Sequence, residues 1–217
     1  MISEATQIQL AALEISPTKP AVICDVDEVV VHFIRDFEDF ISMENLGLRH
    51  GNPSEPYVLF DTSTKSPIPA TRVSNLIDDF FLQRTRNMKS IAGAVEGLQS
   101  LESGASIVML TNLPHFAGDD RRANLASLGL DYPVITNSGP KGPAILNIAS
   151  RTKAPVVFID DSQHFIQSAY DQAPHVHLVH FLHDERFSKF VPELDYVSLR
   201  SDNWHDVKTH TARLLNG

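Results

Sequence analysis

Short apolar runs alternate with amphipathic stretches from residue 90 onward. The runs are rich in β-branched residues and too short for helices, which is typical of buried parallel strands. With the run at 21–24, they predict strands at 107–111, 134–136, 155–159 and 176–181. Apolar residues at helical spacing predict helices at 90–101 (capped by Ser90), 119–128, 141–151, a stretch ending near 172, and 203–215. This alternation predicts an α/β fold, a three-layer, Rossmann-like parallel sheet covered by helices on both faces.

The segment 31–89 has a different pattern. Phenylalanine-rich stripes predict helices at 33–46 and 73–88, on either side of a turn-rich stretch with one short strand at 57–60. The segment is too long for a simple connection between a strand and a helix. We therefore expect a small, mainly helical subdomain at 31–89, inserted into a core formed by 1–30 and 90–217.

Composition and charge narrow the class of protein. The 217 residues are 42% hydrophobic and 21% charged, as in an ordinary globular protein with one good-sized core. The net charge of −9 argues against a nucleic-acid partner. No run approaches the ~20 apolar residues of a membrane span, and the N-terminus does not resemble a secretory signal. The single cysteine, Cys24, lies in an apolar strand and predicts a buried thiol. We expect a cytoplasmic protein with no membrane partner; the sequence leaves its oligomeric state open.

Polar residues follow three of the predicted strands at their carboxyl ends. Asp25 and Asp27 follow the first, Thr111 ends the second, and Asp160 and Asp161 follow the fourth. Ligands of parallel α/β sheets bind beyond these ends. Two carboxylates at one place repel each other, and a divalent cation such as Mg²⁺ relieves that repulsion.

Lys141 begins a predicted helix, and the amino end of a helix favours an anion. Phosphoryl transfer needs such a set of groups, because its catalysis consists mostly of positioning and charge stabilisation. A carboxylate can attack phosphorus, a second acid can protonate the leaving oxygen, and a hydroxyl and an ammonium can hold the other oxygens.

These residues resemble the four motifs of the haloacid dehalogenase (HAD)-like superfamily of phosphohydrolases, in order and spacing, over 21–165. Asp25-Val26-Asp27 resembles the first motif, Leu110-Thr111-Asn112 the second, Lys141 the third and Ile159-Asp160-Asp161-Ser162 the fourth. The insertion at 31–89 lies where many members carry a helical cap.

The resemblance implies a role for each residue. Asp25 is the expected nucleophile and a Mg²⁺ ligand, and Asp27 the general acid/base with its backbone carbonyl on the metal. Thr111 and Lys141, with Asn112 beside them, are expected to bind phosphate. Asp160 and Asp161 complete the metal site, Asp161 directly or through water. The expected reaction is Mg²⁺-dependent hydrolysis of a small phosphorylated metabolite through an aspartyl phosphate.

The sequence departs from the family at Glu28, where members usually have glycine. Glycine eases a tight backbone turn at this position. A glutamate can face the phosphate or point away into the hinge of the cap. We favour the second arrangement, because two like charges facing a phosphate would repel it.

Several other residues have competing interpretations. His175 and His177 share a strand face and could bind a metal, but no third ligand accompanies them, so we favour structural or surface roles for them and for His180 and His183. Lys153 competes with Lys141 for phosphate, but we expect it at the opposite edge of the sheet. Asn112 can contact substrate or shape its turn.

Four other functions compete with the phosphatase. A signalling receiver accepts a phosphoryl group on aspartate, but its accepting aspartate follows a later strand. A non-catalytic scaffold would keep only the fold. A dehalogenase does not need the acid at Asp27, and phosphonate cleavage needs a lysine in the cap. Dinucleotide-binding and phosphate-loop motifs are absent from the sequence.

Overall fold

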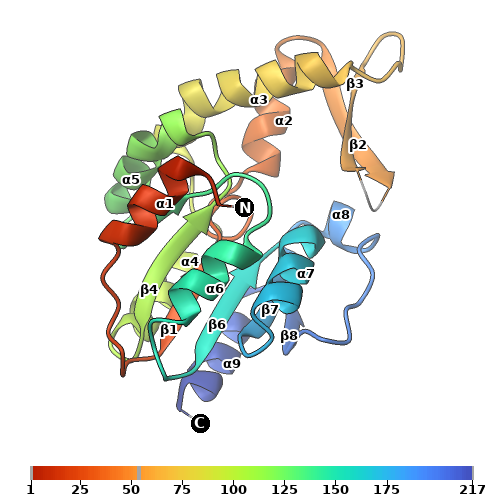
Figure 1. Ribbon diagram of the computed structural model, residues 1–217. Coiled ribbons are helices and arrows are strands. Elements are labelled where there is room, and N and C mark those ends of the chain that lie inside the picture. The colour runs from red at the N-terminus through yellow and green to blue at the C-terminus, as the bar shows by residue number, and fades with distance from the viewer. Residues whose placement is uncertain (1, 53–54, 217) are drawn as a thin grey trace.

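A computed structural model describes residues 2–52 and 55–216 (Figure 1). Its main sheet is parallel and has the strand order β5-β4-β1-β6-β7-β8. The strands are β1 (Ala21–Cys24), β4 (Ser106–Thr111), β5 (Val134–Thr136), β6 (Val156–Asp160), β7 (His177–Phe181) and β8 (Leu199–Ser201). β1 lies between β4 and β6, so the residues that follow it emerge near the middle of the sheet. The predicted parallel α/β sheet is confirmed.

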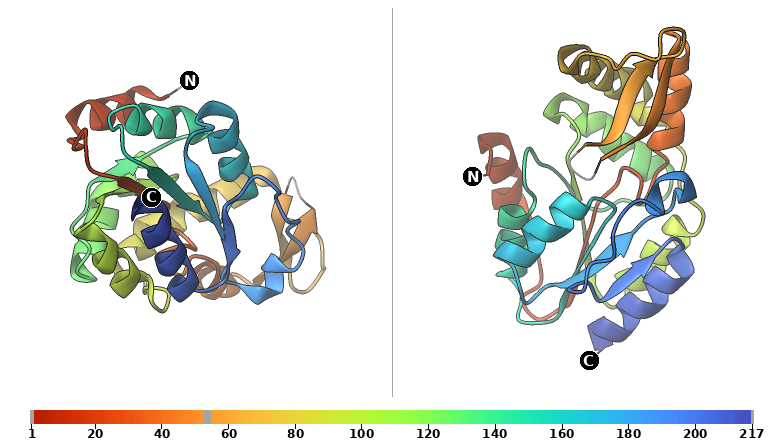
Figure 2. Two further views of the ribbon diagram at one scale, coloured as in Figure 1. Left: turned by 90° about the horizontal axis from the view of Figure 1, so that it is seen from below. Right: turned by 90° about the vertical axis from the view of Figure 1, so that its right-hand side faces the viewer.

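Helices cover both faces of this sheet, as Figure 2 shows. One layer has α1 (Glu4–Ala12), α6 (Gly142–Ala149) and α7 (Gln163–Gln172), and the other α4 (Ala94–Glu102), α5 (Gly118–Ser127) and α9 (Trp204–Asn216). Successive side chains of a strand point to opposite faces. In β1, Ala21 and Ile23 therefore belong to the hydrophobic cluster on the side of α1, α6 and α7. Val22 and Cys24 belong to the cluster on the side of α4, α5 and α9.

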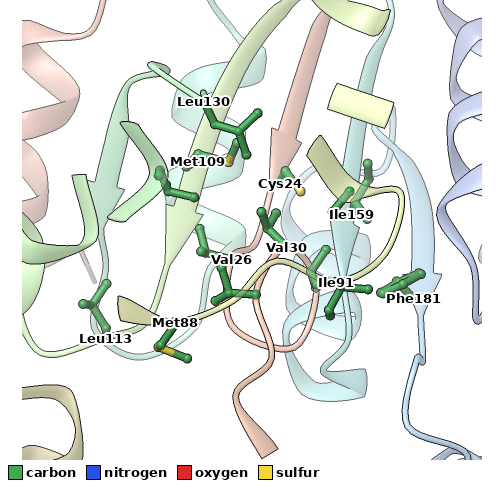
Figure 3. Close-up of a cluster of buried hydrophobic side chains, with 14 of the residues drawn as sticks. Cys24, Val26, Val30, Met88, Ile91, Met109, Leu113, Leu130, Ile159 and Phe181 are labelled. Carbon is green, nitrogen blue, oxygen red and sulfur yellow. The ribbon is translucent and has the colours of Figure 1, made fainter. Parts of the chain in front are cut away.

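The cluster on the side of α4, α5 and α9 lies directly beneath the end of β1 (Figure 3). The Cys24 thiol is fully buried, and this burial raises its pKa well above the ordinary value. The Trp204 indole donates a hydrogen bond of 2.8 Å to the Val29 carbonyl oxygen, which joins α9 to the loop after Asp27. This loop is therefore fixed from below by the core.

A separate group of elements stands beyond the carboxyl ends of β4 and β6 (Figure 1). It consists of α2 (Ile34–Ser42), β2 (Leu46–Asn52), β3 (Glu55–Asp61), α3 (Ala70–Arg84) and the 3-10 turn η1 (Thr85–Asn87). β2 and β3 form a two-stranded antiparallel sheet. The short strand expected at 57–60 is part of β3, whereas its partner β2 was not predicted. The division into a core and a cap at 31–89 stays a prediction; "cap" below means this segment.

One local prediction fails nearby, and two short elements were not predicted. Ser90 does not cap α4, which begins at Ala94 after Gly93 in the left-handed conformation (φ 81°). The short helix α8 (Glu185–Ser188) and strand β8 were not predicted. α8 contacts the cap, since Arg186 pairs with Glu38 at 2.8 Å and the ring centroids of Phe187 and Tyr57 lie 4.8 Å apart. Within the described residues, no helix is long and apolar enough to cross a membrane.

Candidate active site

Lys141 joins the ends of two neighbouring strands. Its Nζ lies 2.6 Å from Asp25 Oδ1 and 2.6 Å from Asp160 Oδ2. Asp25 follows β1 and its N–H donates to the Ile159 carbonyl oxygen of β6 at 2.9 Å, which fixes the direction in which its side chain leaves the sheet. The Lys141 side chain is fully buried, and such a charge is tolerated only when it is paired. The structure thus brings three predicted site residues into one ion-pair network.

Asp161 adds a third carboxylate to this edge. One oxygen from each of Asp25, Asp160 and Asp161 lies within 4.8 Å of the others. The Ser162 N–H donates to Asp160 Oδ1 at 2.8 Å, and the His180 ring nitrogen bonds the Asp161 carbonyl oxygen at 2.9 Å. Both contacts hold the turn after β6. Three converging carboxylate oxygens are the donors that Mg²⁺ prefers, so these residues fit that ion.

Burial dominates the electrostatics of this group. It raises the pKa of Asp25 to about 7, with Lys141 opposing the shift and the neighbouring Asp160 and Asp27 adding to it. Burial also raises the pKa of Asp160, against the effect of Lys141, and that of Asp161, where the nearby carboxylates reinforce it. The ammonium of Lys141 therefore faces more negative charge than it can balance. A divalent cation would lower the free-energy cost of burying these carboxylates together.

The Asp27 side chain has partners of its own beside these three carboxylates. Its Oδ1 pairs with Nη2 of Arg121, and its Oδ2 accepts a hydrogen bond of 3.2 Å from the Thr111 hydroxyl. Thr111 ends β4, so the hydroxyl reaches Asp27 across neighbouring strands. The structure thus brings Asp27 and Thr111 together beside the Asp25 group.

Arg121 was missed by the sequence analysis. Its side chain is fully buried in α5, where Nη1 donates to Asn124 Oδ1 at 3.1 Å. The sequence does indicate that Arg121 faces the core, because it lies four residues after Ala117 and four before Leu125. Residues at this spacing share one face of a helix, and all three are buried. The run Asp119-Asp120-Arg121-Arg122 conceals this stripe, because charged residues on a helix usually face water.

Glu28 turns toward the cap, which confirms the arrangement favoured from the sequence. Its Oε2 accepts hydrogen bonds from the N–H groups of Phe33 at 3.0 Å and Ile34 at 2.8 Å, at the first turn of α2. Burial raises its pKa to about 7, although both hydrogen bonds oppose this. Its φ of 62° is left-handed, the conformation that explains why glycine suits this position.

Asn112 holds a loop at the same edge. Its amide donates to the Gly139 carbonyl oxygen at 2.8 Å, and its Oδ1 accepts from Asn137 at 2.9 Å. These bonds support the loop-shaping alternative that the sequence had left open. A contact of Asn112 with phosphate stays a prediction.

The remaining candidates lie elsewhere. Lys153 is exposed next to the start of β6, at the opposite end of the strand from Asp160. Within the described residues, the group of metal-type ligands contains no histidine. His180 is instead buried, and this burial lowers its pKa to about 4.

No protein-family model and no curated protein matches the sequence. Solved structures do. A HAD family hydrolase from Deinococcus radiodurans R1, solved with bound phosphate and sodium, is 15% identical with a TM-score of 0.59, over 91% of this chain and 96% of that one.

Two further structures give the same result. A haloacid dehalogenase-like hydrolase from Streptococcus pneumoniae is 11% identical with a TM-score of 0.58, over 90% of this chain and 99% of that one. The L-2-haloacid dehalogenase PA0810 is 12% identical with a TM-score of 0.58, over 89% and 99%. The chain therefore has the HAD-like fold predicted from its motifs.

Proposed function

We propose that this chain, whose fold is HAD-like, is a Mg²⁺-dependent hydrolase that removes the phosphoryl group from a small phosphomonoester. The observation that carries the proposal is the contact of one buried ammonium, Lys141, with Asp25 and Asp160 at 2.6 Å each, beside Asp161. A HAD-like relative binds phosphate in its crystal structure, which supports the same ligand class here. A cytoplasmic location stays a prediction.

The carboxylates of Asp25, Asp160 and Asp161 would hold the ion, together with the backbone carbonyl of Asp27 that the resemblance implies. Bound there, Mg²⁺ would neutralise charge between an anionic nucleophile and an anionic phosphoryl group. Lys141 and the hydroxyl of Thr111 would bind the phosphoryl oxygens. The burial of Lys141 strengthens its attraction for an anion, because little water screens it.

In the first step, an Asp25 carboxylate oxygen forms a bond to phosphorus while the ester P–O bond breaks. Asp27, in its protonated form, gives its proton to the departing oxygen, which leaves as an alcohol. In the second step, the Asp27 carboxylate takes a proton from water as the water oxygen forms a bond to phosphorus and the bond between phosphorus and the Asp25 oxygen breaks. Inorganic phosphate leaves, and both side chains regain their starting states.

Dehalogenation is the second candidate, because dehalogenases share the fold. We favour phosphate chemistry since Asp27 is held next to the nucleophile by Arg121 and Thr111, and dehalogenation does not need this acid. Halide release from a 2-haloacid, without phosphate release from any ester, would reverse this preference.

Phosphate release from an aryl phosphate with Mg²⁺ tests the proposal. We expect turnover by the native protein and none by Asp25→Asn, because an amide is a poor nucleophile. Asp119→Asn, whose side chain is 93% exposed, is the matched control and should retain full activity. Undiminished activity of Asp25→Asn would refute the proposal. A phosphorylated protein that never turns over would indicate a signalling receiver, and no reaction at all a scaffold.

A further inference from the structure

The cap contains an apolar cavity of about 190 Å³. It lies among α2, the β2-β3 hairpin and α3, and its lining includes Phe33, Phe37, Leu59 and Ile77. These elements all belong to the segment that stands beyond the carboxyl ends of the sheet (Figure 1). The cavity therefore lies within the cap, and its lining side chains continue the hydrophobic cluster that also packs one face of the sheet.

The lining of this cavity selects against polar ligands. Among the lining residues that the structure describes, none carries a charge, and the Tyr57 hydroxyl is the one polar side-chain group. Burying a hydroxyl or an amide without a partner is unfavourable in proteins. An apolar group instead gains free energy from leaving water.

Three contacts place this cavity next to the candidate active site. The N–H groups of Phe33 and Ile34, which line it, bind the carboxylate of Glu28, the residue after Asp27. The Tyr57 ring, on the hairpin side, packs against Phe187 of the core at 4.8 Å. Burial raises the pKa of Tyr57, and the negative charges of Asp161 and Glu28 add to this effect.

We propose that this cavity binds the organic part of the substrate, and that the substrate is a phosphomonoester of a small apolar alcohol or phenol. This inference rests on the proposed phosphatase function and names its substrate class. The apolar group lies between α2, α3 and the hairpin, while the phosphoryl group lies at Asp25 and Lys141.

The volume limits the size of the apolar group. A cavity of about 150 Å³ lined by leucine, isoleucine and phenylalanine accepts one benzene molecule. The cavity of the cap, at 190 Å³, therefore suits a single aromatic ring or a short branched alkyl group. A larger ring system would require the cap helices to move apart.

Two esters of primary alcohols test the proposal, because their leaving groups are chemically alike. Benzyl phosphate carries an aromatic ring, and glycerol 1-phosphate carries hydroxyls. We expect the native protein to prefer benzyl phosphate by about tenfold or more in kcat/KM, the discrimination typical of one apolar pocket. A ratio near one would overturn the proposal.

Filling the cavity supplies the matched variant. Ile77→Phe adds volume inside the cavity and should reduce the ratio of the two kcat/KM values. Leu82→Phe makes a comparable change on the same helix, at a side chain that is 65% exposed and outside the lining, and should leave the ratio unchanged. An unchanged ratio in Ile77→Phe would contradict the proposal.

Binding of benzyl alcohol distinguishes the proposal of an apolar site in the cap from the proposal of a phosphatase. We expect it to shift the methyl NMR signals of Leu59, Val73 and Ile77 in the native protein, and to shift those of Leu59 and Val73 less in Ile77→Phe. Such shifts without phosphate release from either ester would refute the phosphatase and keep the apolar site. Phosphate release without such shifts would refute the apolar site and keep the phosphatase.

Discussion

Arg121 is the residue whose environment the sequence least reveals. It is fully buried, and its guanidinium connects Asp27 on one side with Asn124 on the other. Asn124 in turn donates to the Met88 carbonyl oxygen at 2.9 Å, in the segment that leads from the cap back to the core. Arg121 therefore fixes the predicted acid/base relative to this segment. Sequence motifs locate Asp27, but they do not show what positions it.

Replacing Arg121 with methionine should lower the free energy of unfolding by about 3 kcal/mol, because it leaves a largely buried carboxylate unpaired. Arg121→Lys should restore part of the lost free energy of unfolding. A lysine keeps the positive charge but cannot contact Asp27 and Asn124 at the same time, as a guanidinium does. Urea unfolding measures both variants. In an Asp27→Asn background, Arg121→Met should cost clearly less; an equal cost would show that the ion pair contributes nothing.

The same variants should affect catalysis according to the leaving group. An alkyl ester depends on protonation by Asp27, whereas an aryl ester with an acidic leaving group depends on it less. Arg121→Met should therefore reduce kcat for an alkyl phosphate more than for an aryl phosphate. Equal reductions would indicate a purely structural role for Arg121.

Glu28 shows what could be predicted at this scale. Repulsion between like charges was sufficient to predict that its side chain turns away from the phosphate site. Its two partners could not be predicted, because the N–H groups of Phe33 and Ile34 become available only where α2 begins.

At the scale of elements, the contact of α6 with α7 determines where Lys141 lies. The Gly142 N–H donates to Ser168 Oγ at 2.9 Å, and a Cβ at Gly142 would lie 2.1 Å from the Ser168 carbonyl oxygen. Only glycine permits this approach, so the residue after Lys141 is fixed by packing rather than by chemistry.

Gly142→Ala should therefore separate α6 from α7 and lower the free energy of unfolding by about 2 kcal/mol, the usual cost of overpacking. It should also reduce turnover, because Lys141 moves with the start of α6. Gly104→Ala is the control, since its Cβ would meet nothing closer than 3.8 Å. Equal stability of the two variants in thermal unfolding would contradict this account.

The elements differ in how well the sequence predicts them. The buried strands β1, β4 and β6 are covered on both faces, so continuous apolar runs identify them. Strand β2, Leu46–Asn52, was not predicted, because it contains two glycines and three polar residues. It becomes ordered by pairing with β3. The edge strand β8, Leu199–Ser201, has a single apolar residue and so no apolar run to identify it, whereas Val134 and Ile135 mark the equally short edge strand β5.

At the scale of the molecule, His32 lies where the cap meets the core. Its ring centroid is 5.4 Å from that of His183, and burial lowers its pKa below 6.5, with Arg35 and His183 adding to this and Asp184 opposing it. The folded state therefore binds fewer protons than the unfolded state. The contribution of the neutral His32 ring to stability is therefore complete above pH 6.5 and is lost as the pH falls below that value.

The native protein should thus lose more free energy of unfolding than His32→Asn when the pH changes from about 7.5 to about 5. His205→Asn, at an exposed histidine of α9, is the control and should behave like the native protein. Parallel pH profiles for the native protein and His32→Asn would contradict the assignment.

Metal binding should stabilise the whole molecule. Mg²⁺ at a hundred times its dissociation constant should add about 2.7 kcal/mol to the free energy of unfolding. Chelation should remove this gain and the activity together. Asp160→Asn, which loses one of the three converging carboxylates, should show a much smaller gain in thermal unfolding. An undiminished gain would place the ion elsewhere.

The central claim is that Asp25 carries the phosphoryl group during turnover. The direct measurement is mass spectrometry of peptides after acid quenching of Asp27→Asn mixed with an aryl phosphate and Mg²⁺. This variant lacks the base that activates water, while an acidic phenol leaves with little help from Asp27, so the phosphorylated form should accumulate. We predict a phosphoryl group on Asp25, and none in the double variant with Asp25→Asn. Phosphate release by the native protein, with no phosphorylated Asp25 or with the phosphoryl group on another residue, would contradict the account.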